Sequence, residues 1–236
     1  MTNRRHKQRG PFVRLAIFDL DNTLIAGDSD HGWGEFMVSE GMVDPVEYKR
    51  SNDQFYADYE RGEMDLQAYL NFSLEPLTHY SLEELAQLHQ KFMREVIDPM
   101  RLPQAEALLA KHRAEGDYLL IITSTNGFIT KPIAASLGVD DILATDAEII
   151  NNRYSGKMTG TPCFQEGKIT RLHQWLASAK SAGFEGDLSD CYFYSDSIND
   201  LPLMQVVDNP VAVDPDDNLR RHAEQQGWPV ISLRDC

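Results

Sequence analysis

Cysteine is scarce in this chain, whose 236 residues include three, Cys163, Cys191 and Cys236. An odd number at these spacings matches neither a disulfide framework nor a zinc-binding pattern. Long apolar runs are also missing, since a membrane-spanning helix needs about 18 or more consecutive apolar residues and the chain contains no such stretch. The sequence therefore argues against a disulfide-rich scaffold and predicts no membrane span.

Positive charge is in deficit. There are 22 Lys and Arg against 37 Asp and Glu, a formal net charge of -15, which opposes binding to nucleic acid or to an anionic membrane. The basic stretch at residues 4–9 lacks the apolar segment of a signal peptide, so we interpret residues 1–12 as a flexible tail. With few cysteines and no targeting signal, we expect a cytoplasmic protein.

Two acidic side chains follow the first apolar run of the chain. Asp19 and Asp21 come directly after Val13–Phe18, which predicts a buried strand. Side chains two apart on a strand point the same way, so both carboxylates face the sheet edge where α/β proteins bind ligands. Paired carboxylates there suit a divalent cation, a nucleophile and a proton donor. The alternative is a turn with solvated acids.

Polar side chains also follow two later predicted strands and begin one predicted helix. They are Asp196, Asn199 and Asp200 after strand 191–195, Thr123, Ser124 and Asn126 at the end of strand 118–123, and Lys168 at the start of helix 168–182. Taken singly, each group has an ordinary explanation, such as a helix N-cap for an acid or a solvated surface position for a lysine. Together they indicate a catalytic site at one edge of the sheet.

The order of helical and strand patterns predicts the architecture. Residues 28–97 are helical in pattern, include a capping box at Ser81–Glu84 and end near Asp98-Pro99. Strands and helices alternate after that, and residues 142–160 predict short strands around Asn151-Asn152 and Gly156-Lys157 that form a hairpin. We expect an α/β protein with a doubly wound, Rossmann-like parallel sheet. Its core would comprise residues 13–27 and 98–236, and residues 28–97 would form a small helical cap domain.

The acidic pair, hydroxyl, lysine and acidic cluster, in this order, resemble the haloacid dehalogenase-like phosphohydrolase superfamily across nearly the whole chain. The helical block after the first motif is similar to the cap of phosphoserine phosphatase-like members. The stretches Asp19–Trp33, Val43–Pro45 and Pro162–Gln165 resemble members of this group linked to histidinol-phosphate hydrolysis.

The resemblance implies hydrolysis of a phosphomonoester through a phosphoaspartate. Asp19 takes the position of the nucleophile and Asp21 that of the general acid and base. Lys168 would hold a phosphoryl oxygen and reduce the charge on Asp19. Thr123 fits the hydroxyl position of the family best, with Ser124 as the alternative.

A Mg²⁺ cofactor is expected as well, because a cluster of carboxylates is costly unless a hard cation offsets it. By resemblance the metal takes Asp19, the backbone carbonyl of Asp21, and Asp196. Thr23 is expected to orient Asp21 or its loop. Three further residues are expected near the metal ion or the phosphoryl group, namely Asn126, Asn199 and Asp200.

The expected substrate is a small phosphorylated metabolite that bears an amine. Asp28 stands where phosphoserine phosphatases have a glutamate for the substrate amine, and Asp30 and Trp33 beside it suit a cationic ligand. Packing in the cap is the alternative for Trp33. We therefore expect L-histidinol phosphate first and phosphoserine second. A phosphotransferase and a phosphate-accepting module without turnover remain open, as do a monomer and a homodimer.

Overall fold

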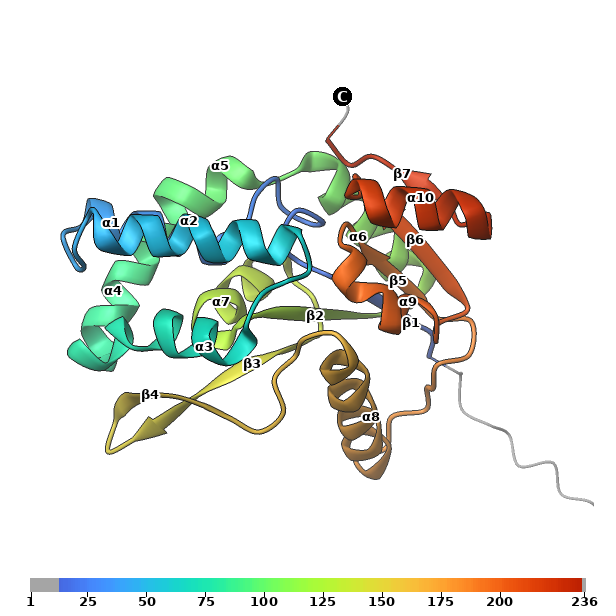
Figure 1. Ribbon diagram of the computed structural model, residues 1–236. Coiled ribbons are helices and arrows are strands. Elements are labelled where there is room, and N and C mark those ends of the chain that lie inside the picture. The colour runs from blue at the N-terminus through green and yellow to red at the C-terminus, as the bar shows by residue number, and fades with distance from the viewer. Residues whose placement is uncertain (1–12, 235–236) are drawn as a thin grey trace, which may run out of the picture.

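The computed structural model describes residues 13–234, and Figure 1 shows its elements. The strands are β1 (Leu15–Phe18), β2 (Tyr118–Asn126), β3 (Asp141–Ile150), β4 (Arg153–Thr159), β5 (Tyr192–Ser195), β6 (Asn209–Val213) and β7 (Val230–Ile231). They form one sheet in the order β4-β3-β2-β1-β5-β6-β7. Neighbours run parallel except β3 and β4, which are antiparallel. The predicted doubly wound α/β sheet is confirmed.

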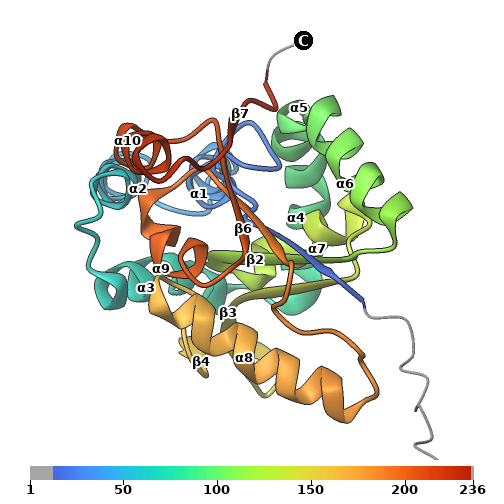
Figure 2. The ribbon, with the colours of Figure 1, turned by 90° about the vertical axis from the view of Figure 1, so that its right-hand side faces the viewer.

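Helices cover both faces of this sheet (Figure 2). They are α6 (Pro103–Glu115), α7 (Gly127–Leu137), α8 (Glu166–Ser181), α9 (Leu201–Met204) and α10 (Asp217–Gln226), and a 3₁₀ turn η3 (Ile198–Asp200) precedes α9. Phe18 of β1 belongs to one hydrophobic cluster with Ile133 of α7, while Ile17 belongs to another with Leu172 of α8. A central strand covered on both faces must be apolar at every position, which explains the unbroken apolar run of β1.

The chain between β1 and β2 is helical. Its elements are α1 (Ser29–Ser39), α2 (Glu47–Glu60), α3 (Leu66–Leu74), the 3₁₀ turn η1 (Pro76–His79), α4 (Leu82–Phe92), the π-helical turn η2 (Met93–Ile97) and α5 (Asp98–Met100). They lie together at the left of Figure 1. The predicted capping box begins α4, with the side chains of Ser81 and Glu84 each accepting a hydrogen bond from the backbone N–H of the other.

The connections into and out of this helical segment lie side by side. Ile25 and Arg101 form an antiparallel bridge, and the N–H of Ala26 donates to the carbonyl of Met100 at 2.8 Å. Helical turns continue beyond the end predicted near Asp98-Pro99, because Pro99 lies in the first turn of α5, where a missing N–H costs no helical hydrogen bond. The segment therefore leaves and rejoins the sheet at one place.

Two local features concern the hairpin and the last strand. The hairpin predicted at residues 142–160 is confirmed as β3 and β4, and its turn residues Asn151 and Asn152 have φ values of 50° and 60°. The short β7 was not predicted from the sequence.

None of the helices in residues 13–234 combines the length and the apolar character that crossing a membrane requires.

Candidate active site

Two aspartates lie directly after β1, at the carboxyl edge of the sheet. Asp19 extends the pairing of β1 with β5, because its N–H donates to the carbonyl of Tyr194 at 2.9 Å. The chain then turns at Asn22, whose φ of 55° lies in the left-handed region that asparagine tolerates. Asp19 and Asp21 are 5% and 9% exposed. The two acids expected from the sequence are thus nearly removed from bulk water.

Hydrogen bonds hold both oxygens of Asp21. The N–H of Ser29, in the first turn of α1, donates to Oδ1 at 2.6 Å, and the hydroxyl of Thr125 donates to Oδ2 at 2.9 Å. Burial raises the pKa of Asp21 to about 7, the charge of Asp28 raises it too, and the hydrogen bonds from Ser29 and Thr125 oppose the rise. A carboxyl group in this state can give and take a proton near neutral pH.

Lys168 is fully buried between two carboxylates. Its Nζ lies 2.8 Å from Oδ1 of Asp19 and donates to Oδ2 of Asp200 at 2.7 Å. The hydroxyl of Ser195 donates to the same oxygen of Asp200 at 2.7 Å. Burial raises the pKa of Asp19 to about 7, although Lys168 opposes the shift. The structure thus joins Lys168, Asp19 and Asp200, three residues that the sequence predicted for one site.

Close packing at the start of α8 positions this lysine. A Cβ on Gly167 would lie 2.1 Å from the carbonyl oxygen of Pro162, so only glycine fits there without a shift of the backbone. Gln165, two residues earlier, has a φ of 47°. The strained approach to the helix therefore places Lys168 under the end of β1.

An irregularity in the sheet arranges the hydroxyl side chains after β2. The register of β2 and β3 shifts between Ile122 and Asn126, and such bulges redirect side chains beside active sites. Thr123 and Ser124 both line the pocket described below. Thr123 also accepts a hydrogen bond from the N–H of Thr125 at 3.2 Å. Thr123 and Ser124 therefore both remain candidates for the phosphate-binding hydroxyl.

Asp196 and Asn199 follow β5 and differ in their partners. The hydroxyl of Thr23 donates to Oδ1 of Asp196 at 2.9 Å. Thr23 thus contacts Asp196 and not Asp21, and of the two expected roles the bond fits the second, holding the loop after β1. The side chain of Asn199 donates to the backbone carbonyl of Tyr59 at 3.0 Å. Asn199 thus connects the sheet edge with the end of α2.

A pocket of about 590 Å³ of empty space, partly open to solvent, lies between the helical segment and the carboxyl edge of the sheet. Its acidic lining residues are Asp19, Asp21, Asp28 and Asp30. Its aromatic lining residues are Phe55, Tyr56, Tyr59 and Tyr69. Within residues 13–234, no Lys or Arg side chain lines it. The acids expected for the nucleophile and for the amine thus share one cavity.

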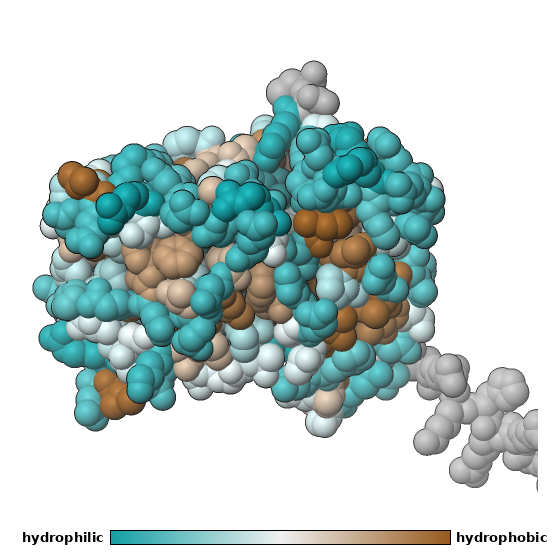
Figure 3. Space-filling view, viewed as in Figure 1, coloured by the Kyte–Doolittle hydropathy of each residue, from teal (hydrophilic) through white to brown (hydrophobic). Residues whose placement is uncertain are grey.

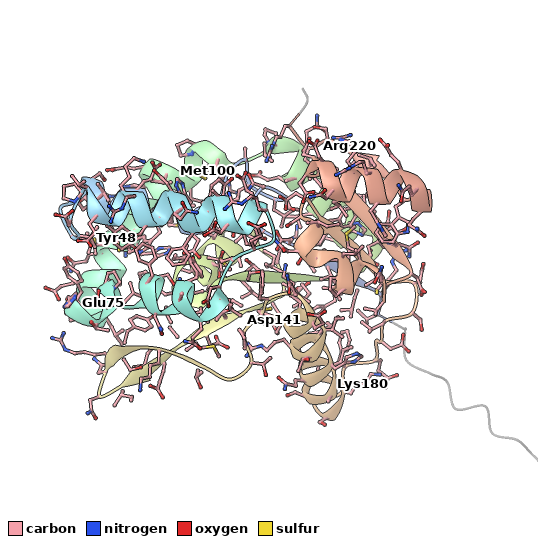
Figure 4. The ribbon with its side chains drawn as sticks, viewed as in Figure 1. Tyr48, Glu75, Met100, Asp141, Lys180 and Arg220 are labelled. Carbon is pink, nitrogen blue, oxygen red and sulfur yellow. The ribbon has the colours of Figure 1, made fainter. Side chains whose placement is uncertain are left out.

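Helices α2 and α3 form the wall of this pocket away from the sheet. The lining side chains are Asn52, Phe55, Tyr56 and Tyr59 of α2 and Leu66 and Tyr69 of α3. Outside the lining, Tyr48 of α2 stacks on Phe72 of α3 with ring centroids 4.4 Å apart, and Figure 4 shows Tyr48 above Glu75, the residue after α3. Apolar side chains reach the surface between the two helices in Figure 3. An apolar and aromatic wall of this kind suits a ring-bearing ligand.

Seven of the expected site residues do not line the pocket, namely Thr23, Trp33, Asn126, Lys168, Asp196, Asn199 and Asp200. The contacts of two of them, Trp33 and Asn126, indicate other roles. Trp33 is 2% exposed and packs against Phe36, Phe92 and Phe128, with ring centroids 5.3, 5.1 and 5.0 Å away. Its position on the buried side of α1 corrects the expected contact with substrate. The side chain of Asn126 caps α7 by accepting from the N–H three residues later at 3.3 Å, so its role is to begin a helix.

Several lining residues were missed from the sequence. Phe55, Tyr56 and Tyr59 lie on α2, a helix in which Asn52 alone is buried. Aromatic residues on a helix without a buried apolar face could have indicated a pocket wall. The sequence held one indication that Thr125 belongs to the site. It lies two residues beyond Thr123, and side chains two apart share a face in a regular strand.

The family model of the haloacid dehalogenase-like hydrolases matches residues 16–205. The chain therefore belongs to this family, and the resemblance stated from its motifs is confirmed. Within the family it is a phosphatase. It is 47% identical, over 93% of its own length and 99% of the other, to a protein from Neisseria meningitidis serogroup C named histidinol-phosphatase.

A more distant relative is named as a phosphatase of another substrate. A phosphoserine phosphatase of Mycobacterium tuberculosis is 28% identical, over 93% of this chain and 70% of its own. Among solved structures, a protein with unknown function from Bordetella pertussis Tohama I superposes with a TM-score of 0.86 at 43% identity, covering 94% and 99% of the two chains. A substrate-bound phosphoserine phosphatase superposes with a TM-score of 0.69 at 14% identity, covering 96% of each chain, and this likeness concerns the fold alone.

Proposed function

We propose that this phosphatase is a Mg²⁺-dependent phosphomonoesterase that converts L-histidinol phosphate to L-histidinol through a phosphoaspartate. The assignment of the substrate rests on the charge of the pocket. Its lining contains four aspartates and, within the described chain, no Lys or Arg. The leaving group of histidinol phosphate bears an amine and an imidazole. That of phosphoserine also bears a carboxylate, which would lie among like charges with no Lys or Arg in the pocket lining to pair with it. The similarity to the Neisseria protein supports the same choice.

The chemistry we propose uses Asp19 and Asp21 in turn. A carboxylate oxygen of Asp19 attacks phosphorus while the bond from phosphorus to the alcohol oxygen breaks, and that oxygen takes the proton of Asp21. Asp21, now ionised, removes a proton from water. The water oxygen attacks phosphorus, the acyl phosphate bond breaks, and inorganic phosphate leaves with Asp19 restored as a carboxylate.

Lys168 would assist both steps of this reaction. Its ammonium group has three donors, of which Asp19 and Asp200 engage two at 2.8 and 2.7 Å. Nζ also lies 2.6 Å from the other oxygen of Asp200, and it would turn one donor from there to a phosphoryl oxygen bound at Asp19. The hydroxyl of Thr123, with Ser124 as the alternative, would bind the phosphoryl group from the end of β2.

The residues present fit a magnesium ion. One carboxylate oxygen of Asp19 pairs with Lys168 and one of Asp196 with Thr23. Within residues 13–234, no hydrogen bond occupies their other oxygens, which leaves two oxygen donors of the kind Mg²⁺ prefers. Asp19, Asp196 and the backbone carbonyl of Asp21 would hold the ion, which would offset the negative charge of the phosphoryl group.

The helical segment would act as a cap. We propose residues 28–97 as this unit, because its helices supply most of the pocket wall opposite the sheet. The hydrogen bond from Asn199 to the carbonyl of Tyr59 joins the segment to the chain after β5. A cap held in this way would exclude water while Asp19 attacks.

Phosphate release from L-histidinol phosphate and from L-phosphoserine, measured side by side with Mg²⁺, tests the proposal. We expect a clear preference for L-histidinol phosphate, no turnover by Asp19→Asn, and loss of activity with EDTA that added Mg²⁺ restores. Activity in Asp19→Asn would refute the mechanism. Preference for L-phosphoserine would refute the substrate. A stable phosphoprotein without turnover would instead indicate a phosphate-accepting module.

A further inference from the structure

Two aspartates line the pocket from the start of α1, and their partners differ. Asp28 is the N-cap of the helix, and its Oδ1 accepts from the N–H groups of Asp30 and His31 at 2.9 and 2.8 Å. This leaves one oxygen of Asp28 for a ligand. Asp28 is also close enough to Asp21 for its charge to raise the pKa of that group. Asp28 thus lies beside the reacting groups.

Asp30 has its partner on another helix. The phenol of Tyr69, in α3, donates a hydrogen bond to Oδ2 of Asp30. Within residues 13–234, no hydrogen bond engages Oδ1 of Asp30, and its side chain lines the pocket without a Lys or Arg beside it. An acid in this position is held in place and still has an oxygen free to accept from a ligand.

Aromatic rings line the same pocket as this acid. Tyr69 meets Phe55 edge to face, with ring centroids 5.5 Å apart, and Tyr56 lies 4.9 Å from the ring of His31. All four side chains line the pocket. Aromatic faces attract a flat cation, and a carboxylate beside them accepts its N–H. The part of the pocket around Asp30 therefore matches a protonated nitrogen ring.

We propose that Asp30, positioned by Tyr69, is the residue that selects the ring of the leaving group, by accepting a hydrogen bond from an imidazolium N–H. Asp28 binds the amine of the same leaving group. Two acids thus recognise two nitrogen groups, and substrate preference is determined mainly by Asp30. This inference rests on the proposed function.

Comparison of two substrates tests the assignment. L-histidinol phosphate carries the amine and the ring, whereas O-phosphoethanolamine carries the amine alone. We expect Asp30→Asn to lower kcat/KM for L-histidinol phosphate by about 30-fold, mainly through KM, because a charge-assisted hydrogen bond is lost. The preference for L-histidinol phosphate over O-phosphoethanolamine should fall by a similar factor. Asp28→Asn should lower kcat/KM for both substrates.

Further variants separate recognition from folding. Tyr69→Phe keeps the ring and removes the donor to Asp30, so it should lower the preference in the same direction and by less. Glu47→Gln makes the same acid-to-amide change at an exposed position of α2, outside the pocket, and should leave both substrates unaffected. Circular dichroism and thermal unfolding report whether each variant is folded.

Binding of the product gives a readout that is independent of turnover. Calorimetry with L-histidinol should show a Kd about 30-fold weaker in Asp30→Asn than in the unmodified chain. An equal loss for both substrates, or an unchanged Kd, would overturn the role of Asp30 and leave the proposed function intact. If the unmodified chain does not prefer L-histidinol phosphate to L-phosphoserine, the proposed function and this inference both fail. If Asp30→Asn does not fold, Tyr69→Phe decides the matter by its substrate preference.

Discussion

The hydroxyl of Thr125 donates a hydrogen bond to Oδ2 of Asp21 across 2.9 Å, between residues 104 positions apart in the chain. Thr125 lies within the stretch of β2 where the register with β3 shifts, and Asp21 lies in the turn after β1. The bond joins the two sheet-edge segments that carry the proposed acid and the proposed phosphate-binding hydroxyl. Its loss should therefore affect catalysis more than folding.

We expect Thr125→Val to lower kcat by about tenfold or more with little change in KM, because Asp21 loses the partner that orients it and misplaced catalytic groups act poorly. Valine keeps the shape of threonine. Steady-state kinetics on L-histidinol phosphate measure the effect. Thr125→Ser retains the hydroxyl and should recover most of the activity, and a Ser variant as impaired as the Val variant would contradict this role.

Lys168→Met should abolish turnover and lower the free energy of unfolding by about 3–5 kcal/mol, because it leaves Asp19 and Asp200 buried without their cation. Urea unfolding measures the stability. The double variant Lys168→Met with Asp200→Asn removes one of the uncompensated charges, so it should be more stable than Lys168→Met and still inactive. Equal stability of the two variants would show that the charge of Asp200 is not costly in this site.

Gly167→Ala should destabilise the fold by about 1–3 kcal/mol and reduce activity, because the new Cβ would lie 2.1 Å from the carbonyl oxygen of Pro162 and force α8 to shift. The shift would move Lys168 away from Asp19. Chemical unfolding and kcat measure both effects. Thr170→Ala, an exposed change on the same helix, should remain within about 0.5 kcal/mol of the unmodified protein.

Asp117 provides a prediction on pH that is independent of catalysis. It lies just before β2 and accepts from Nε of Arg14 at 2.8 Å and from a second guanidinium nitrogen at 2.7 Å, while Nδ1 of His112 lies 2.7 Å from its Oδ2. Burial would raise the pKa of Asp117, but the hydrogen bonds from Arg14 and His112 outweigh it and lower the pKa. The folded state therefore favours the charged form.

A lowered pKa in the folded state stabilises the protein above the pKa of the unfolded chain, about 3.9, and this stabilisation is lost as the pH falls further. Asp117→Asn should thus cost about 2–3 kcal/mol at pH 7. The cost should become smaller below about pH 4. Urea unfolding of both proteins at neutral and acidic pH tests this, and a difference that does not change with pH would contradict it.

Much of the site could be predicted because its chemistry is carried by short motifs at strand ends. Asp19, Asp21 and Asp196 each follow an apolar run, and parallel strands bring their carboxyl ends to one edge. Lys168 was predicted from its order among these motifs, and the structure pairs it with Asp19. Trp33 was misassigned because an aromatic residue near an acidic loop can face either a pocket or a core.

The sequence by itself determined the α/β class and the order of the elements, since periodicity and motif spacing are local properties, and it supplied the candidates for the reacting groups. Only the tertiary structure decided which side chains meet. Three hydrogen bonds illustrate this, those of Thr125 with Asp21, Thr23 with Asp196 and Tyr69 with Asp30. They depend on the sheet order, on a register shift and on the packing of α3 beside the pocket. Such contacts join positions far apart in the chain, and no local pattern encodes them.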